Sequence, residues 1–234
     1  MKEGPLLGVV LASAARLQEL VPDAVLVGGS AAALHADHRL SFGHVHVLID
    51  LTQRYAEVVA AVVASEGWVT SVRASSPPLT LLGSLDGIEA GLRQLRRTRP
   101  LEVQQYAVAA GRTVRAPTIE EMLRVKAYLV VQRNALRDYL DTVALADRLG
   151  PEAAREVLGG IDDYYADRSA QDDSVLTSLV TRLSEPAPRD VRVTRQLGSY
   201  KGLDPRWHEW SAVVDACHAL ADALVASLEG GSGP

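Results

Sequence analysis

The sequence has few aromatic residues and a single cysteine. Aromatic residues make up 5% of its 234 positions and phenylalanine occurs once, so leucine, valine and alanine must fill the interior. Cys217 has no second cysteine to pair with, which excludes an internal disulfide and is typical of a reducing compartment. We therefore predict a cytoplasmic protein with an aliphatic core.

The sequence also lacks a long apolar segment and an excess of positive charge. A membrane-spanning helix needs about 20 consecutive apolar residues, and the first apolar run is soon interrupted by Arg16 and Glu19. We expect no signal peptide and no membrane association. The net charge of −5 argues against broad electrostatic attraction to nucleic acid, although it is compatible with a local basic surface.

What the sequence does contain is hydrophobic patterning of two kinds. Over residues 1–116, segments with helical spacing, at 5–20 and 52–66 among others, are interspersed with several short segments that read as strands. Over residues 117–234 the helical period dominates, and Thr118 with Glu121 forms a capping box where this part begins. We therefore predict an α/β (α+β) domain with a mixed sheet over 1–116 and a helical domain over 117–234.

A glycine turn follows the first predicted strand. Gly28 and Gly29 precede an alanine-rich helix, for which Ser30 is the expected N-cap. Glycine lets a phosphate approach backbone N–H groups, and the helix dipole favours an anion there. Such a turn alone is a weak indication, but about a dozen residues later Arg39, Ser41 and a second strand follow. Together they predict a phosphate-binding turn.

The second strand carries the residues that decide the chemistry. Two acids at positions i and i+2 of a strand point to the same face and can hold Mg²⁺ together. The strand instead begins Gly43, His44, Val45, His46. Imidazole binds Zn²⁺, Mn²⁺ or Fe²⁺ but is a poor ligand for Mg²⁺, which prefers hard oxygen ligands.

On these residues the chain resembles the AbiEii/MenT-type nucleotidyltransferase toxins of the DNA polymerase β-like superfamily, over roughly residues 20–150. The matching residues are Gly28-Gly29-Ser30, His35, His38, Arg39, Ser41, Lys126, Arg133-Asn134 and Arg137-Asp138-Tyr139-Leu140-Asp141. The resemblance implies a polymerase β-like nucleotidyltransferase domain followed by a helical domain.

The resemblance also implies roles for individual residues. Gly28, Gly29, Ser30, Arg39 and Ser41 would bind the nucleotide. Lys126 would also contact its phosphates, and Asp138 would support Lys126 or the acceptor. Relatives carry an Asp-x-Asp motif that would fall on Gly43 and Val45 of this sequence, and neither residue can ligate a metal. A shift of one residue would place His44 and His46 there instead.

Three functions are compatible with these residues. An active enzyme, with Mg²⁺ or Mn²⁺, would transfer a nucleotide from an NTP to tRNA or protein and would have a cognate antitoxin. A pseudoenzyme would bind a nucleotide, RNA or a protein partner without turnover. A recruited fold would use His44 and His46 as catalytic groups on a small molecule. Across these hypotheses the candidate catalytic residues are His44, His46, Lys126 and Asp138.

Overall fold

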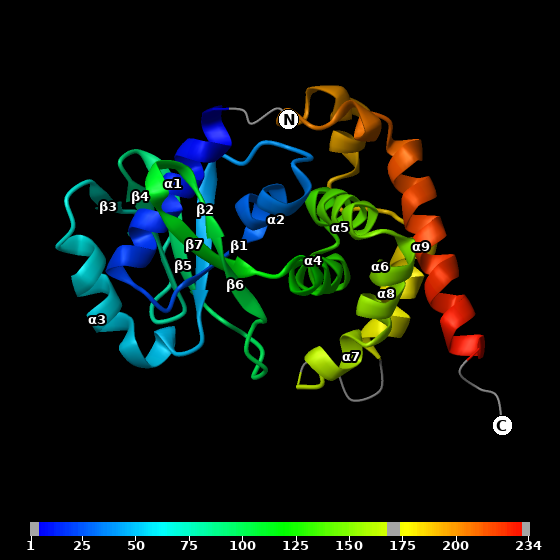
Figure 1. Ribbon diagram of the computed structural model, residues 1–234, viewed down its shortest axis with the longest axis horizontal. Coiled ribbons are helices and arrows are strands. Elements are labelled where there is room, and N and C mark those ends of the chain that lie inside the picture. The colour runs from blue at the N-terminus through cyan, green and yellow to red at the C-terminus, as the bar shows by residue number, and fades with distance from the viewer. Residues whose placement is uncertain (1–4, 168–173, 231–234) are drawn as a thin grey trace. The chain divides into compact units, whose positions relative to one another are not determined.

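The computed structural model describes residues 5–167 and 174–230 of the chain (Figure 1). It divides into two compact units, residues 1–118 and 119–234, whereas the sequence placed the boundary after residue 116. In the described part of the chain, no helix is both long enough and apolar enough to cross a membrane.

The first unit is built on a mixed sheet. Its elements are α1 (Pro5–Leu20), β1 (Val25–Val27), α2 (Gly28–Ala36), β2 (Gly43–Leu48), α3 (Leu51–Val63), β3 (Trp68–Thr70), β4 (Thr80–Leu85), β5 (Ile88–Gln94), β6 (Val103–Ala107), η1 (Ala109–Gly111) and β7 (Thr113–Pro117). The five-stranded sheet has the order β1-β2-β5-β4-β3, and β6 pairs with β7 separately. Strands β2 and β5 run parallel, and the other neighbours are antiparallel.

Helices α1 and α3 cover one face of this sheet with aliphatic side chains (Figure 1). The core comprises Leu17, Val21, Ala24, Leu48, Leu51, Val58, Val62, Leu81, Leu85, Ala90 and Leu92. Burying an aliphatic side chain of this size stabilises a fold by about 1.5–3 kcal/mol. The scarcity of aromatic residues is thus offset by leucine and valine, as expected.

The second unit is helical. Its elements are α4 (Ile119–Arg133), α5 (Leu136–Leu149), α6 (Pro151–Gly159), α7 (Ile161–Tyr164), α8 (Val175–Ser184), η2 (Val191–Ser199), η3 (Pro205–Trp207) and α9 (Trp210–Gly230). Gly150, with a φ of 89°, lies between α5 and α6 in a conformation that favours glycine. The predicted class, an α/β part with a mixed sheet followed by a helical part, is confirmed.

Candidate functional site

The glycine turn joins β1 directly to α2. Gly28 has a φ of 78°, a left-handed conformation that lets the chain pass from strand to helix without a linker. The helix therefore begins at Gly28, and Val27 is its N-cap. The prediction that Ser30 is the N-cap is wrong, because Ser30 lies within the first turn of the helix.

The hydroxyl of Ser30 ties this turn to the start of β2. It lies 2.5 Å from the carbonyl oxygen of Gly43 and 2.9 Å from Oγ of Ser41, and it donates toward both. The Ser41 hydroxyl is itself 3.2 Å from the same carbonyl. Ser30 is 1% exposed. Its hydroxyl is therefore engaged by these two contacts, which fix the shape of the turn.

Arg39 lies directly over the turn. A Cβ atom on Gly29 would be 2.8 Å from Nη2 and 3.2 Å from Nη1 of Arg39, so only glycine permits this approach. The arginine is 6% exposed, and its Nη1 donates to the carbonyl oxygen of Leu40 at 3.3 Å. A guanidinium beside the N-terminus of a helix is a strong arrangement for binding an anion. The structure thus brings together five of the six residues predicted to bind a nucleotide, Gly28, Gly29, Ser30, Arg39 and Ser41, whereas the sixth, Lys126, belongs to the second unit.

The two faces of β2 have different roles. His44, His46 and Leu48 are buried, whereas Gly43, Val45 and Val47 on the other face are partly exposed. A Cβ atom on Gly28 would be 3.9 Å from Cβ of Val45. The positions where the resembled family carries its acids therefore face the glycine turn, and they hold glycine and valine.

One carboxylate lies beside these positions. Glu89 on β5 pairs in register with Gly43, and a Cβ atom on Gly43 would be 2.7 Å from Cβ of Glu89. Glu89 is exposed. No group of three or more His, Cys, Asp or Glu side chains in residues 5–167 and 174–230 is arranged to hold a metal ion. A pair of metal ions needs several carboxylate ligands, so the residues present do not fit the usual two-metal site.

His44 and His46 lie in the core and not in a cleft. They are 2% and 0% exposed, and their rings meet edge to face with centroids 5.2 Å apart. Nε2 of His44 is 3.0 Å from Oγ of Ser13, whereas neither ring nitrogen of His46 has a hydrogen-bond partner among the described residues.

Burial sets the charge of both rings. It lowers the pKa of His44 from 6.5 to about 4. Burial, followed by the proximity of His44, holds the pKa of His46 well below 6.5. Both rings are neutral at pH 7 and shielded from solvent, which does not fit catalysis or metal binding in an open cleft.

In the second unit, Lys126 forms a buried ion cluster. Its Nζ lies 2.6 Å from Oδ2 of Asp141 and 3.6 Å from Oδ1 of Asp138, and all three side chains are at most 4% exposed. Lys126 is therefore not a solvated surface lysine, although that is the usual state of a lysine on an amphipathic helix. Asp138 has no hydrogen-bond partner for either carboxylate oxygen among the described residues. Arg137, which directly precedes Asp138 on α5, is exposed.

The sequence alone did not show which of these charges would be buried. Helical periodicity places Lys126 near the apolar positions of α4, but a lysine at such a border ordinarily extends to solvent. The additional signal is the pair Asp138 and Asp141, three residues apart on the next helix and therefore on one face of it.

Known proteins resemble this chain in two ways, some in sequence and others in fold. No protein-family model matches the chain. The heme uptake protein MmpL11 of Mycobacterium tuberculosis is 35% identical over 130 residues, and the mycolic acid-containing lipids exporter MmpL11 of Mycolicibacterium smegmatis is 31% identical over 131 residues. These alignments cover 56% of this chain, which spans only 13% of the length of either MmpL11 protein.

The solved structures point to the fold. A protein from H. pylori assigned as a nucleotidyltransferase superposes with a TM-score of 0.51 and 13% identity over 100% of both chains. The antibiotic-resistance factor ANT(2'')-Ia superposes with a TM-score of 0.50 and 13% identity, over 68% of this chain and 93% of its own. The chain therefore shares the fold of these two nucleotidyltransferase structures.

Proposed function

We propose that the first unit binds the phosphate groups of a nucleotide at the glycine turn and does not carry out metal-dependent nucleotidyl transfer. The observation that carries this proposal is the placement of the Arg39 guanidinium over Gly29 at the N-terminus of α2. The helix dipole, the backbone N–H groups of the first turn and a fixed cation all favour an anion at this point.

The proposal that no transfer occurs rests on the face of β2 that points to the turn. A catalytic pair of metal ions stabilises the charge on the attacking and leaving oxygens, and carboxylates must hold those ions. Gly43 and Val45 supply no ligand, and Glu89 supplies a single carboxylate. Nucleotide binding without turnover is the function that these residues support best.

The alternative is a transferase of the AbiEii toxin type. It would use Mg²⁺ or Mn²⁺, carry a nucleotide to tRNA or protein, and pair with an antitoxin. In that mechanism Lys126 would neutralise the triphosphate and Asp138 would orient Lys126. The buried ion cluster supports a positioned ammonium group, but it supplies no metal ligands on β2.

Calorimetric titration with ATP, GTP, CTP and UTP, each with and without Mg²⁺ or Mn²⁺, tests the proposal. We expect binding that survives removal of the metal and that weakens at least about tenfold in Arg39→Met, because a charge-assisted contact to phosphate is lost. Arg73→Met is the matched control, because Arg73 is an exposed arginine of the same unit. No binding at about 1 mM of any nucleotide would contradict both nucleotide-dependent functions.

A second measurement separates the binding protein from the transferase. The chain is incubated with radiolabelled NTPs, total tRNA and either metal, and incorporation into RNA and protein is counted. We expect no incorporation. Metal-dependent labelling of RNA or protein would establish the transferase instead.

The similarity to MmpL11 favours a second function. We propose that the chain acts together with a membrane transport protein, since more than half of it aligns with a segment of such proteins at 35% identity. The test is retention of the purified chain on nanodiscs that contain a purified MmpL11-type transporter, with empty nanodiscs as the control. Equal retention on both would contradict it.

A further inference from the structure

A hollow of about 220 Å³ lies in the first unit at the end of β1 opposite the glycine turn. Its apolar wall is made of Val25, Val47, Ile49, Leu95, Leu101 and Val103. Val25 and Val47 are direct cross-strand partners of β1 and β2. The hollow is therefore bounded by sheet on one side and by the segment between β5 and β6 on the other.

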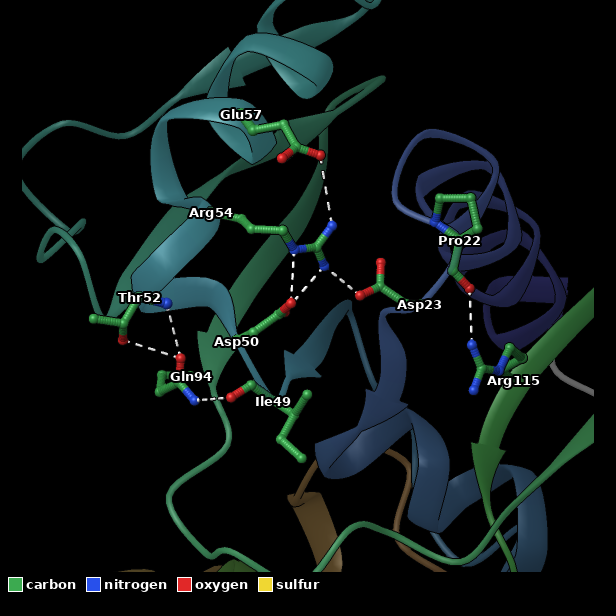
Figure 2. Close-up of polar contacts among 9 residues, drawn as sticks. All are labelled: Pro22, Asp23, Ile49, Asp50, Thr52, Arg54, Glu57, Gln94 and Arg115. Carbon is green, nitrogen blue, oxygen red and sulfur yellow. Dashed lines mark hydrogen bonds and ion pairs between the residues drawn. The ribbon is translucent and has the colours of Figure 1, made fainter.

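Hydrogen bonds fix the walls of this hollow. Arg97 is 5% exposed, and it donates to the carbonyl oxygens of Arg99 at 2.9 Å and Pro100 at 3.0 Å. Gln94 donates to the carbonyl oxygen of Ile49 at 2.6 Å (Figure 2). The segment after β5 and the end of β2 are thus held in place, as a preformed binding site requires.

Arg115 on β7 supplies a positive charge at the edge of the hollow. Its Nη1 donates to the carbonyl oxygen of Pro22 at 3.0 Å (Figure 2), and its backbone N–H and carbonyl are both bonded to the side chain of Gln18. Within residues 5–167 and 174–230, no carboxylate forms an ion pair with Arg115. Its guanidinium is therefore positioned by the Pro22 carbonyl group and not by an ion pair.

The acid on the rim has its own partner. Asp23 lines the hollow and pairs with Arg54, which also contacts Asp50 through Nε at 2.8 Å and Glu57 through Nη1 at 3.6 Å (Figure 2). Pro22, whose carbonyl oxygen accepts from Arg115, directly precedes Asp23. The side chains of Arg115 and Asp23 nevertheless have different partners, the Pro22 carbonyl group and Arg54. Arg115 is thus left as the group that can receive an anion.

We propose that this hollow binds a small carboxylic acid with a branched apolar body. The apolar wall would cover the hydrocarbon body, and the planar guanidinium of Arg115 offers the paired donors that a carboxylate accepts. A volume of about 220 Å³ suits a small acid better than a nucleotide. The proposal concerns residues outside the glycine turn and does not depend on nucleotide binding there.

Isocaproate and its neutral amide, isocaproamide, are matched probes of this proposal. Each is titrated into the full chain labelled at the valine, leucine and isoleucine methyl groups, and shifts are followed by NMR. We expect isocaproate to shift the methyl signals of Val25, Val47 and Leu101, and to bind at least about tenfold more tightly than the amide, because only the acid carries the charge that Arg115 receives.

Two variants locate the contact. Arg115→Met should weaken isocaproate binding by about tenfold or more, because it keeps an apolar stem and removes the charge. Arg112→Met is the control, since Arg112 is exposed, pairs with Glu19 and does not line the hollow. The methyl signal of Val62 in the core reports whether each variant remains folded.

The proposal is overturned if the acid and the amide bind equally, if Arg115→Met binds like the wild type, or if about 20 mM isocaproate shifts no methyl signal of the hollow. The comparison of acid with amide uses the unaltered protein, so it decides the matter even if Arg115→Met does not fold.

Discussion

Mild acid should destabilise the first unit through its two buried histidines. Burial lowers the pKa of His44 from 6.5 to about 4, so the unfolded chain takes up a proton at a higher pH than the folded chain does. This contribution to stability is complete above pH 6.5 and is lost as the pH falls from 6.5 toward 4. Each pKa unit corresponds to about 1.4 kcal/mol.

The expected size follows from these values. Between pH 7 and pH 5, His44 alone should lower the free energy of unfolding by about 2 kcal/mol, and by pH 4 the loss should reach about 3 kcal/mol. His46 is fully buried and its pKa is lowered in the same direction, so it adds to the loss. A change of this size is a substantial part of the stability of an ordinary domain.

Urea unfolding at pH 7, 6 and 5, followed by circular dichroism, measures this effect. The double variant His44→Gln/His46→Leu should lose most of the pH dependence over this range, whatever its stability at pH 7. His218→Gln is the control, because His218 lies exposed on α9. If the double variant kept the full pH dependence of the wild type, the buried pair could not be its cause.

The other predictions concern the ion cluster and the two glycine contacts. Lys126→Met should lower the free energy of urea unfolding by about 3–5 kcal/mol, because it leaves two buried carboxylates without their cation, and an effect no larger than that of the exposed-site variant Arg137→Met would contradict this. Gly29→Ala should weaken nucleotide binding at least about tenfold with little loss of stability, since its Cβ would meet the end of the Arg39 side chain at 2.8 Å and displace the guanidinium. Gly8→Ala, within α1 and with no atom within 4 Å of its added Cβ, is the matched control, and equal nucleotide affinities of the two variants would refute the argument. Gly43→Asp should cost about 1–3 kcal/mol by urea unfolding, because its Cβ would meet the backbone of β5, and a fully stable variant would show that β2 and β5 separate easily.

The fold class could be predicted because it depends on local patterns. A few neighbouring residues are enough to identify the alternation of a strand, the turn at Gly28 or the helical period after Thr118. The orientation of β2 could not be predicted in this way. Hydrophobicity alone would turn Val45 and Val47 to the core and the histidines outward, and the structure has the reverse.

The reason lies in contacts between distant segments. Ser13 on α1 meets His44 across 31 positions of sequence, and the valine face of β2 is directed to the glycine turn. Likewise, the hollow beside Arg115 is assembled from β1, β2, β6, β7 and the segment after β5. No single stretch of sequence carries its shape, so it could not have been recognised from motifs.

The close approach of Gly43 to β5 determines what an acid at this position of β2 would require. The atoms of Glu89 that would meet a Cβ at position 43, at 2.7 Å, include its backbone carbonyl oxygen, which cannot rotate out of the way as a side-chain tip can. An aspartate could be accommodated there only if the two strands moved apart, so it would require at least one further change elsewhere in the sheet. Val45 already carries a Cβ, which lies 3.9 Å from the place that a Cβ on Gly28 would take. The two positions on this face of β2 therefore differ: position 45 accommodates a side chain in the present packing, whereas β5 excludes even a Cβ at position 43.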